Sequence, residues 1–444
     1  MNGKYSPELY KSGILMDDEV SCDSNIGALK ARYSRQFNDI DNDDNVTEDI
    51  DDFLSKKEKF EPNALSTEKV INGPVWTTKA VQKQFVVNST PSTLDSRYMK
   101  WNDVAVIRQY NNDGESTIEV EFHDVTLHHA IQLNNVGTRF TMADVSAQFV
   151  AFCSQCDDGP ARLHVIHFGA WDLSKEWTID LPAAENLSCL AVTDEWLAVA
   201  SLKYVWLFTS AGLQFNMFAL LSEPVTMAAC SNKLSVVYNE SVDTDGSPLY
   251  SCLLIENPAK VCATQAVSLR IPLSSESQLA WLGFTDENTL CACDSAGLVL
   301  AYKHGLWIPI FNAQMINGDF FWIISIQERI RHIRGIRCAK SSNHKYPAVF
   351  PRPVVSTCEF KIPLCDSDTE KSTWEENLLL ANSRSVPKGS FSEDDLETIQ
   401  NELEKTKLQA VLKLFLIACN NDRDCRAYDI ARLCDKATTL NALV

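Results

Sequence analysis

The stretch Trp196–Phe208, with the sequence WLAVASLKYVWLF, decides the fold class. Its two runs of aliphatic and aromatic residues flank a short turn, which is typical of neighbouring β-strands. Runs of the same kind recur along the chain, at residues 84–87, 104–107, 117–122, 163–168 and 234–238. Short strands separated by about 8–12 residues indicate an antiparallel all-β fold.

This strand pattern extends over residues 73–365, which is too long for a single β-sandwich. Radial repetition of four-stranded blades protects the sheet edges of a fold of this size. At roughly 45 residues per blade, as in WD-type repeats, the length predicts six blades. Partial repeat signals are the Trp171-Asp172 dipeptide and the turn Asp294–Gly297 before another apolar run. We therefore expect a mainly β protein with a six-bladed β-propeller over residues 73–365.

The first 72 residues have a different composition. Between Asp39 and Asp52 the chain carries eight acidic residues and no basic one. Such a segment repels itself and buries too little apolar surface to fold, so residues 1–72 are predicted to be a disordered acidic linker. A calcium loop starting at Asp41 is the alternative, but Val46 stands where that loop requires glycine.

After Pro363 the spacing of apolar residues becomes that of helices. It predicts helices over residues 369–384, from Ser392 to about 420, and over 423–435. A threonine at 438 or 439 would cap a fourth helix, but the chain stops at Val444. We expect a small helical domain over 366–444 whose last helix is missing.

The start of the second helix carries the clearest local signal. Ser392 and Asp395 stand at the N-cap and N3 positions, as in a capping box with Asp in place of Glu. Phe391 and Leu396 occupy the positions of a hydrophobic staple. These four residues predict a well-defined helix start.

The net charge of −19 and the isoelectric point near 4.9 limit the possible partners. Affinity for nucleic acid without sequence preference depends on Lys and Arg that neutralise phosphates. An acidic chain is therefore expected to meet DNA only indirectly or weakly. No apolar run reaches the roughly 20 residues that span a bilayer, so no membrane contact is predicted.

Metal and redox sites have weak support. Cys153 and Cys156 form a C-x-x-C motif, but a structural zinc site usually needs a second such pair. A turn follows this motif in place of the helix that a thioredoxin-like site requires. On a strand, His128 and His129 would point to opposite faces, and His123 alone cannot hold an ion. No cofactor and no metal are expected.

Catalytic motifs are equally weak. The chain has no phosphate-binding P-loop, no dinucleotide fingerprint after a strand and no nucleophile elbow. The segment Ser241–Gly246 only partly matches the acidic box of sialidase propellers. Four arginines alternate with apolar residues in Gln327–Arg337, which is more typical of a charged outer face than of a nucleic-acid-binding strip. The sequence therefore predicts a protein that is not an enzyme.

Several segments together resemble one family, the WD-repeat and HMG-box DNA-binding proteins of animals, whose yeast counterpart is the chromosome-transmission-fidelity replisome hub. The segments that carry the resemblance are, in order, Tyr98–Asn102, Ile107–Asn111, Val120–Asp124, His128–Ala130, Trp171–Trp177, Asp180–Pro182, Ala280–Phe284, Pro351–Pro353 and Phe360–Pro363.

The resemblance implies a nuclear, chromatin-associated scaffold that forms a homotrimer. Members of the family link the replicative helicase, through GINS and Cdc45, to DNA polymerase alpha. The N-terminal WD40 propeller and the C-terminal HMG box of the family are absent from this chain. Direct DNA binding through a dedicated module is therefore not expected, and residues 1–72 would correspond to the linker between two propellers.

In the yeast protein, short acidic and apolar peptides dock on the helical domain. Helix periodicity combined with this resemblance nominates apolar residues for a peptide groove and lysines that would meet an acidic peptide. The nominated residues are Lys405, Lys407, Leu412, Lys413, Phe415, Tyr428 and Leu433. The same apolar residues could instead form the core of the helical bundle.

Two other functions remain open at this point. One is an unrelated scaffold of the coat or pore type, with a propeller and a helical tail. The other is a propeller enzyme, which would need several carboxylates converging in a central funnel. Copurifying partners would distinguish the first from a replisome adaptor, and turnover of a glycoside or phosphoester would reveal the second.

Overall fold

The computed structural model describes residues 82–433, except 113, 156–158, 170–174, 183–184, 243–247, 261–263, 314–318, 340–343, 368 and 385–392. The chain divides into two compact units, Met1–Gly73 and Pro74–Val444, and all of the described residues belong to the second. Several sequence expectations lie outside the described residues. These are the acidic linker and calcium loop in 1–72, the Trp171-Asp172 dipeptide, the cap at Ser392 and the helix after residue 438.

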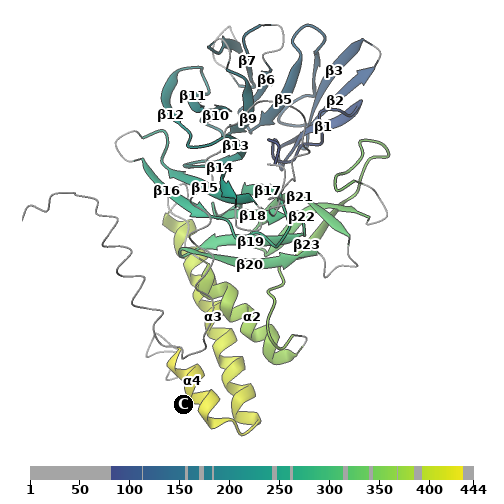
Figure 1. The fold of residues 1–444 in the computed structure, drawn as a ribbon. Helices are drawn as coiled ribbons and strands as arrows, with labels where there is room; N and C mark the ends of the chain where they lie inside the picture. Colours follow the sequence, from purple (N-terminus) through teal and green to yellow (C-terminus); the bar gives the residue numbers. More distant parts are fainter. Residues whose placement is uncertain are drawn as a thin grey trace, which may run out of the picture. The chain divides into compact units, whose positions relative to one another are not determined.

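Six antiparallel sheets follow one another along the chain and form the blades of a propeller (Figure 1), which confirms the expected architecture. The strands of blades 1 to 3 are β1 (Ser96–Trp101), β2 (Ala105–Asn112), β3 (Glu115–Phe122), β4 (Ile131–Asn134), β5 (Phe140–Val145), β6 (Phe149–Ser154), β7 (Arg162–His167), β8 (Glu176–Asp180), β9 (Leu187–Val192), β10 (Trp196–Ser201), β11 (Tyr204–Thr209) and β12 (Gln214–Ala219).

Blades 4 to 6 continue this pattern, with four, four and three strands. Their strands are β13 (Pro224–Cys230), β14 (Lys233–Val242), β15 (Pro248–Glu256), β16 (Gln265–Arg270), β17 (Leu279–Phe284), β18 (Leu290–Asp294), β19 (Leu298–Lys303), β20 (Leu306–Asn312), β21 (Phe320–Gln327), β22 (His332–Cys338) and β23 (Val355–Glu359).

The core of the propeller lies between adjacent blades. Ile107 and Ile118 of blade 1, for example, pack in one apolar cluster with Phe152 of blade 2. Strands β6 and β10 are buried along their whole length. A strand covered on both faces needs a nearly continuous apolar sequence, which explains the run WLAVAS at the start of the deciding stretch.

Blade 6 closes onto blade 1 through side chains, because no strand is shared between these two sheets in the described part of the chain. Trp322 of blade 6 packs against Tyr98 and Trp101 of blade 1. The loop between β22 and β23 adds Arg352, whose guanidinium lies 3.0 Å from Oε1 of Glu121. Ring closure therefore depends on apolar packing and ion pairs.

Residues 82–90, the axial segment, run along the inner strands of the ring. Asn88 is buried, and its Nδ2 donates to the carbonyl of Trp101 in blade 1 (2.7 Å) and of Ile324 in blade 6 (2.8 Å). Val86 packs with apolar residues of blades 2 and 3. The axial segment thus supplies further contacts across the ring closure.

Three helices follow the propeller: α2 (Glu370–Ser383), α3 (Glu393–Asn420) and α4 (Asp424–Arg432). They agree with the three helices expected from the sequence. Thr369 caps α2, since its side chain accepts from Ser372 N while the Ser372 side chain accepts from the Thr369 backbone N–H. Among the described residues, no helix is both long and apolar enough to cross a membrane.

Candidate partner-binding surface

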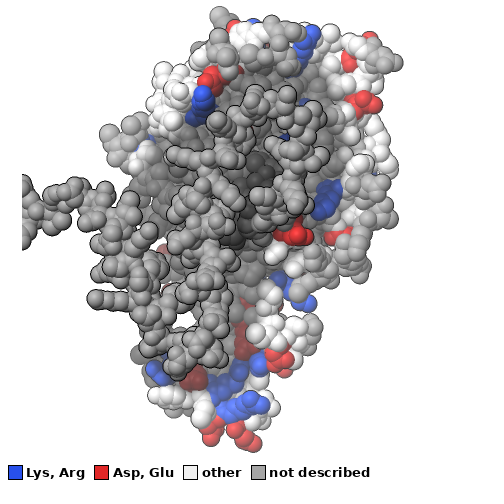
Figure 2. Space-filling view, viewed as in Figure 1, with Lys and Arg blue, Asp and Glu red and all other residues white. Residues whose placement is uncertain are grey.

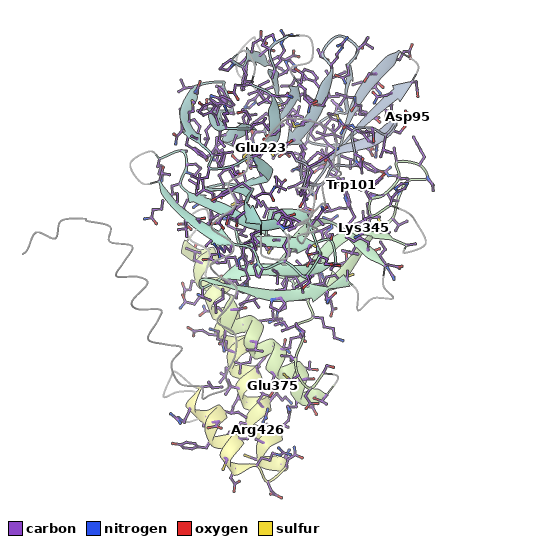
Figure 3. The ribbon with its side chains drawn as sticks, in the orientation of Figure 1. Asp95, Trp101, Glu223, Lys345, Glu375 and Arg426 are labelled. Carbon is purple, nitrogen blue, oxygen red and sulfur yellow. The ribbon has the colours of Figure 1, made fainter. Side chains whose placement is uncertain are left out.

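The helical module has its own small core. Leu378 of α2, Leu414 of α3 and Ile430 of α4 pack in one apolar cluster. Glu375 of α2 and Arg426 of α4 form an ion pair across the module (Figure 3). Basic and acidic side chains are mixed over the helices in the view of Figure 2. The module therefore presents a charged surface around a compact apolar interior.

The structure separates the nominated apolar residues into two groups. Phe415 is half-buried against the helical core, and Leu412 is half-buried outside it. Tyr428 on α4 and Leu433 at its C-cap are exposed, by 66% and 58% of their surface. Phe415 therefore supports the core, whereas Leu412, Tyr428 and Leu433 remain available to a partner.

Sequence reasoning missed Leu416, which is 53% exposed and lies one helical turn after Leu412. Lys405 precedes Leu412 by two turns on the same helix face and is exposed, as is Lys413. Lys407 is half-buried. Leu412 and Leu416 thus form an apolar pair on α3, and Lys405 and Lys413 are exposed on the same helix.

One buried ion pair that the sequence did not predict joins the helices to the propeller, and a second lies beside it within the propeller. Arg384, at the end of α2, binds the carboxylate of Glu287 in the turn between β17 and β18. Beside this pair, Lys303 Nζ lies 2.5 Å from Glu328 Oε1, with both side chains at most 6% exposed. Leu380 of α2 belongs to the core cluster of the later blades. These contacts fix one end of α2 to blades 5 and 6.

Burial changes the pKa values of two acidic residues where α2 meets blades 5 and 6, Glu287 and Asp286. Burial raises the pKa of Glu287, and the opposing hydrogen bond from Arg384 only partly compensates. Burial also raises the pKa of Asp286, whose carboxylate accepts from the backbone N–H of Glu328 (2.6 Å). Positioning the helices thus requires burial of acidic groups, which is costly without their partners.

The four arginines of the strip 327–337 all have partners on neighbouring elements. They pair as Arg329 with Glu402, Arg331 with Asn377, Arg334 with Asp103 and Arg337 with Asp319. Two of these partners lie on α3 and α2, and one lies in blade 1. The strip therefore connects parts of the fold; Arg329 and Arg337 are exposed, as expected of a charged outer face, whereas Arg331 and Arg334 are half-buried.

The histidines and the cysteine that were considered as metal or redox residues pack against or lie close to other parts of the propeller. His123 Nε2 lies 2.9 Å from the carbonyl of Asn102, and the His128 ring packs against Phe122. Burial raises the pKa of the Cys153 thiol well above its ordinary value; Cys156 lies outside the described residues. Within the described ranges, no group of three potential metal ligands converges.

The central funnel holds a cavity of about 180 Å³. Among its lining residues, Asp144 pairs with Lys100 at 3.1 Å and accepts from Val192 N at 3.1 Å. Asp103 accepts from Ser325 Oγ and from Arg334. Both carboxylates of the cavity are therefore engaged in holding blades together.

A six-bladed propeller whose later blades anchor a helical module defines the class of propeller scaffolds with an appended interaction module. The chain belongs to the Mcl1/Ctf4 family, as the resemblance indicated. The family model described as minichromosome loss protein, Mcl1, middle region, matches residues 83–364. The model described as DNA polymerase alpha-binding protein Ctf4, C-terminal domain, matches residues 367–444.

Curated relatives agree with this assignment. The chain is 33% identical over 430 residues to WD repeat and HMG-box DNA-binding protein 1 of Xenopus laevis, covering 94% of this chain and 36% of that protein. Its human counterpart is 32% identical over 451 residues, with coverage of 96% and 39%. Minichromosome loss protein 1 of Schizosaccharomyces pombe is 25% identical over 438 residues, with coverage of 91% and 52%. The chain spans little more than a third of the length of the vertebrate relatives.

Among solved structures, the chain is similar to the crystal structure of HIRA(644-1017), with a TM-score of 0.32 and 12% identity over 64% of this chain and 79% of that one. This likeness is too distant to support an argument. The family itself consists of non-catalytic replication scaffolds.

Proposed function

We propose that the protein is a replisome adaptor that binds DNA polymerase alpha through its helical module. The observation that carries the proposal is the match of residues 367–444 to the C-terminal domain of a DNA polymerase alpha-binding protein, directly after a matching propeller. A replication role implies a nuclear location. The family resemblance adds the helicase components GINS and Cdc45 as further partners.

The proposed peptide-binding surface lies on α3 and at α4. Leu412 and Leu416 provide adjacent apolar side chains, and Tyr428 on the next helix and Leu433 at its C-cap are exposed. Apolar anchors at helical spacing are a common way to hold a partner helix. Lys405, Lys407 and Lys413 would meet the acidic residues of the bound peptide.

Such a surface gives weak binding at one site, so the adaptor function requires more than one copy. In a homotrimer, three weak sites on one assembly raise the effective concentration of the tethered partners. Light scattering on the purified chain is expected to give a mass near three times 49.7 kDa. A monomer at all concentrations would contradict the trimeric adaptor.

Binding of the catalytic subunit of DNA polymerase alpha tests the site directly. The double variant Leu412→Asp with Leu416→Asp and the triple variant Lys405→Glu, Lys407→Glu and Lys413→Glu should each weaken capture at least tenfold. Lys203→Glu, on an exposed turn of the propeller, is the matched control and should bind normally. Normal capture by both helix variants would exclude this surface.

A further inference from the structure

In the part of the chain that the structure describes, blade 6 has three strands, whereas each of the other five blades has four. Its last strand, β23, pairs with β22 on one side. Among the described residues, no strand pairs with the other side of β23. A free edge of this kind presents backbone donors and acceptors that can pair with another strand.

The register identifies the groups that this edge offers. Phe360 N donates to Arg331 O at 2.9 Å, so this pair is hydrogen-bonded and the pairs along the ladder alternate from it. The backbone N–H and C=O groups of Val355, Thr357 and Glu359 therefore point away from β22. Thr357 and Glu359 are also exposed. The edge can accept an extended segment of about five residues, roughly 17 Å long.

The position of a fourth strand in blade 6 follows from the other blades. Fourth strands of adjacent blades contact one another, as where Trp307 Nε1 of β20 donates to the carbonyl of Arg270 in β16 (2.8 Å). A segment added to β23 would by the same geometry lie between β20 of blade 5 and β4 of blade 1. These two strands are the walls of the open position.

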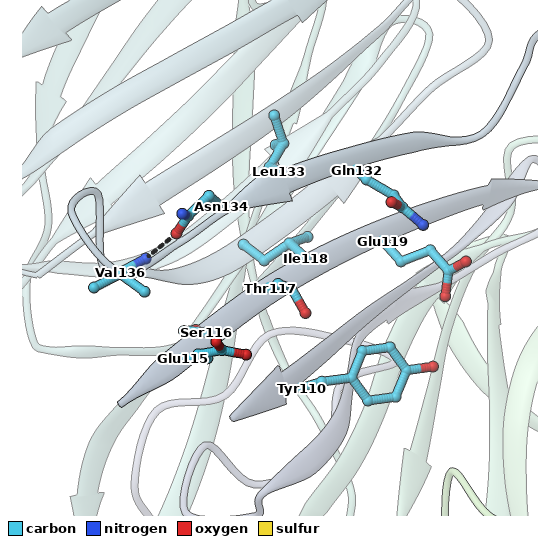
Figure 4. Close-up of a pocket in the computed structure, with 10 residues that line it drawn as sticks. All are labelled: Tyr110, Glu115, Ser116, Thr117, Ile118, Glu119, Gln132, Leu133, Asn134 and Val136. Carbon is cyan, nitrogen blue, oxygen red and sulfur yellow. Dashed lines mark hydrogen bonds between the residues drawn. The ribbon is translucent and has the colours of Figure 1, made fainter. Parts of the chain in front are cut away.

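The wall on blade 1 is polar. Tyr110, Thr117, Glu119 and Gln132 project from β2, β3 and β4 on one face (Figure 4), which is the face opposite the buried Ile118. They line a hollow of about 460 Å³. The loop between β22 and β23 covers the inner part of this face, where Phe350 stacks on Tyr110.

The charge of this wall is negative. Glu115, Glu119 and Glu121 lie on β3, and the guanidiniums of Arg108 and Arg352 reach Glu121 at 2.5 and 3.0 Å. Three carboxylates against two guanidiniums leave an excess of negative charge. A basic side chain on the bound segment would complement it.

The wall on blade 5 is apolar. Leu306 and Ile308 of β20 lie on the same face as Lys303, which pairs with Glu328 of blade 6, so this face is turned toward blade 6. Leu306 is 67% exposed and Ile308 is half-buried. An apolar side chain on the bound segment would cover them.

We propose that the free edge of β23 binds an extended peptide of a partner protein, in which apolar residues alternate with basic ones. Alternation follows from strand geometry, because successive side chains of an added strand face blade 5 and blade 1 in turn. The backbone pairing supplies affinity and the two walls supply sequence preference. The site uses no residue of α3 or α4, so its failure and the failure of polymerase binding are distinguishable.

The test uses the full chain and fluorescein-labelled seven-residue peptides. A peptide that alternates valine with lysine should bind saturably in a fluorescence anisotropy titration. The same peptide with glutamate in place of lysine, or with proline at its centre, should bind about tenfold more weakly. Equal binding of all three peptides would overturn the proposal, as would no saturable binding of the first.

Variants of the protein locate the contact. Thr357→Pro removes an outward N–H without breaking the ladder to β22, and should weaken binding about tenfold, whereas Thr357→Val should not. Leu306→Asp should also weaken binding, and Glu119→Lys should shift the preference to the glutamate peptide. Leu306→Asp and Glu119→Lys test the proposal even if Thr357→Pro does not fold. Self-association that Thr357→Pro abolishes, without peptide binding, would assign the edge to a second copy and overturn the partner assignment.

Discussion

The indole N–H of Trp281 donates to Oδ1 of Asn88 over 2.7 Å, although the two residues are 193 positions apart. Asn88 also donates to the backbone of blades 1 and 6. One buried amide thus joins three blades at the axis of the ring. Removal of this amide should therefore destabilise the ring.

Replacement of Asn88 by Ala should lower the free energy of unfolding by about 2–4 kcal/mol, because it leaves a buried indole N–H and two buried carbonyls without this partner. Urea denaturation followed by tryptophan fluorescence measures the change. Ser92→Ala, at an exposed position nearby, is the control and should have little effect. An unchanged midpoint for Asn88→Ala would show that the axial segment does not stabilise the ring.

The Lys303–Glu328 pair should behave as a buried ion pair. Glu328→Gln alone leaves a buried ammonium without its counterion and should cost about 3–5 kcal/mol. The double variant Lys303→Met with Glu328→Leu removes both charges and should recover most of that loss. Urea denaturation of both variants measures the two changes in stability. A double variant that is no more stable than Glu328→Gln would contradict the prediction for a buried ion pair.

Acid should weaken the contact between Glu121 and Arg352. Burial alone would raise the pKa of Glu121, but the hydrogen bonds and charges of Arg108 and Arg352 outweigh it and lower the pKa below 4.5. A carboxyl with a lowered pKa in the folded state contributes stability above its ordinary pKa, and this contribution is lost as the pH falls through the folded value. The stability difference between wild type and Glu121→Gln should therefore shrink below about pH 4.5.

That difference can be followed by urea denaturation at several pH values, with Glu195→Gln, on an exposed turn, as the control. A difference that stays constant down to pH 3 would mean that Glu121 does not titrate with folding.

Gly335 should not tolerate a side chain. A Cβ at this position would lie 2.4 Å from the carbonyl oxygen of Trp322 and 2.6 Å from the Phe321 ring. Gly335→Ala should therefore destabilise the protein by about 1–3 kcal/mol through overpacking in blade 6. Gly137→Ala, where a Cβ meets no atom within 4 Å, is the control. Equal melting temperatures of the two variants would contradict the close approach.

The propeller could be predicted because its strands are buried on both faces. The run Trp196–Phe208 is apolar nearly throughout, and only a sheet between two other sheets requires such a sequence. That blade 6 has only three strands among the described residues could not be predicted in the same way. A polar face on β3, as at Glu119, is also what a strand exposed to water shows.

The candidate binding site was harder to predict than the fold. Helix periodicity identifies the apolar face of α3, but it does not tell which of its residues the other helices cover. Phe415 is packed against the core, while Leu416, the next residue, is half exposed. The junction pair of Arg384 and Glu287 joins residues 97 positions apart, and no local sequence pattern marks such a contact.

The contacts that close the ring can form only late in the synthesis of the chain. Asp103 meets Arg334, and Glu121 meets Arg352, each across 231 positions of sequence. At roughly 5–20 residues per second, a ribosome needs about 10–45 s to supply the second partner after the first. During this interval blade 1 has no neighbour on one side, and Tyr98 and Trp101 are uncovered in the nascent chain. Synthesis that stops before blade 6 would therefore leave the apolar side chains of Tyr98 and Trp101 without the Trp322 contact that covers them.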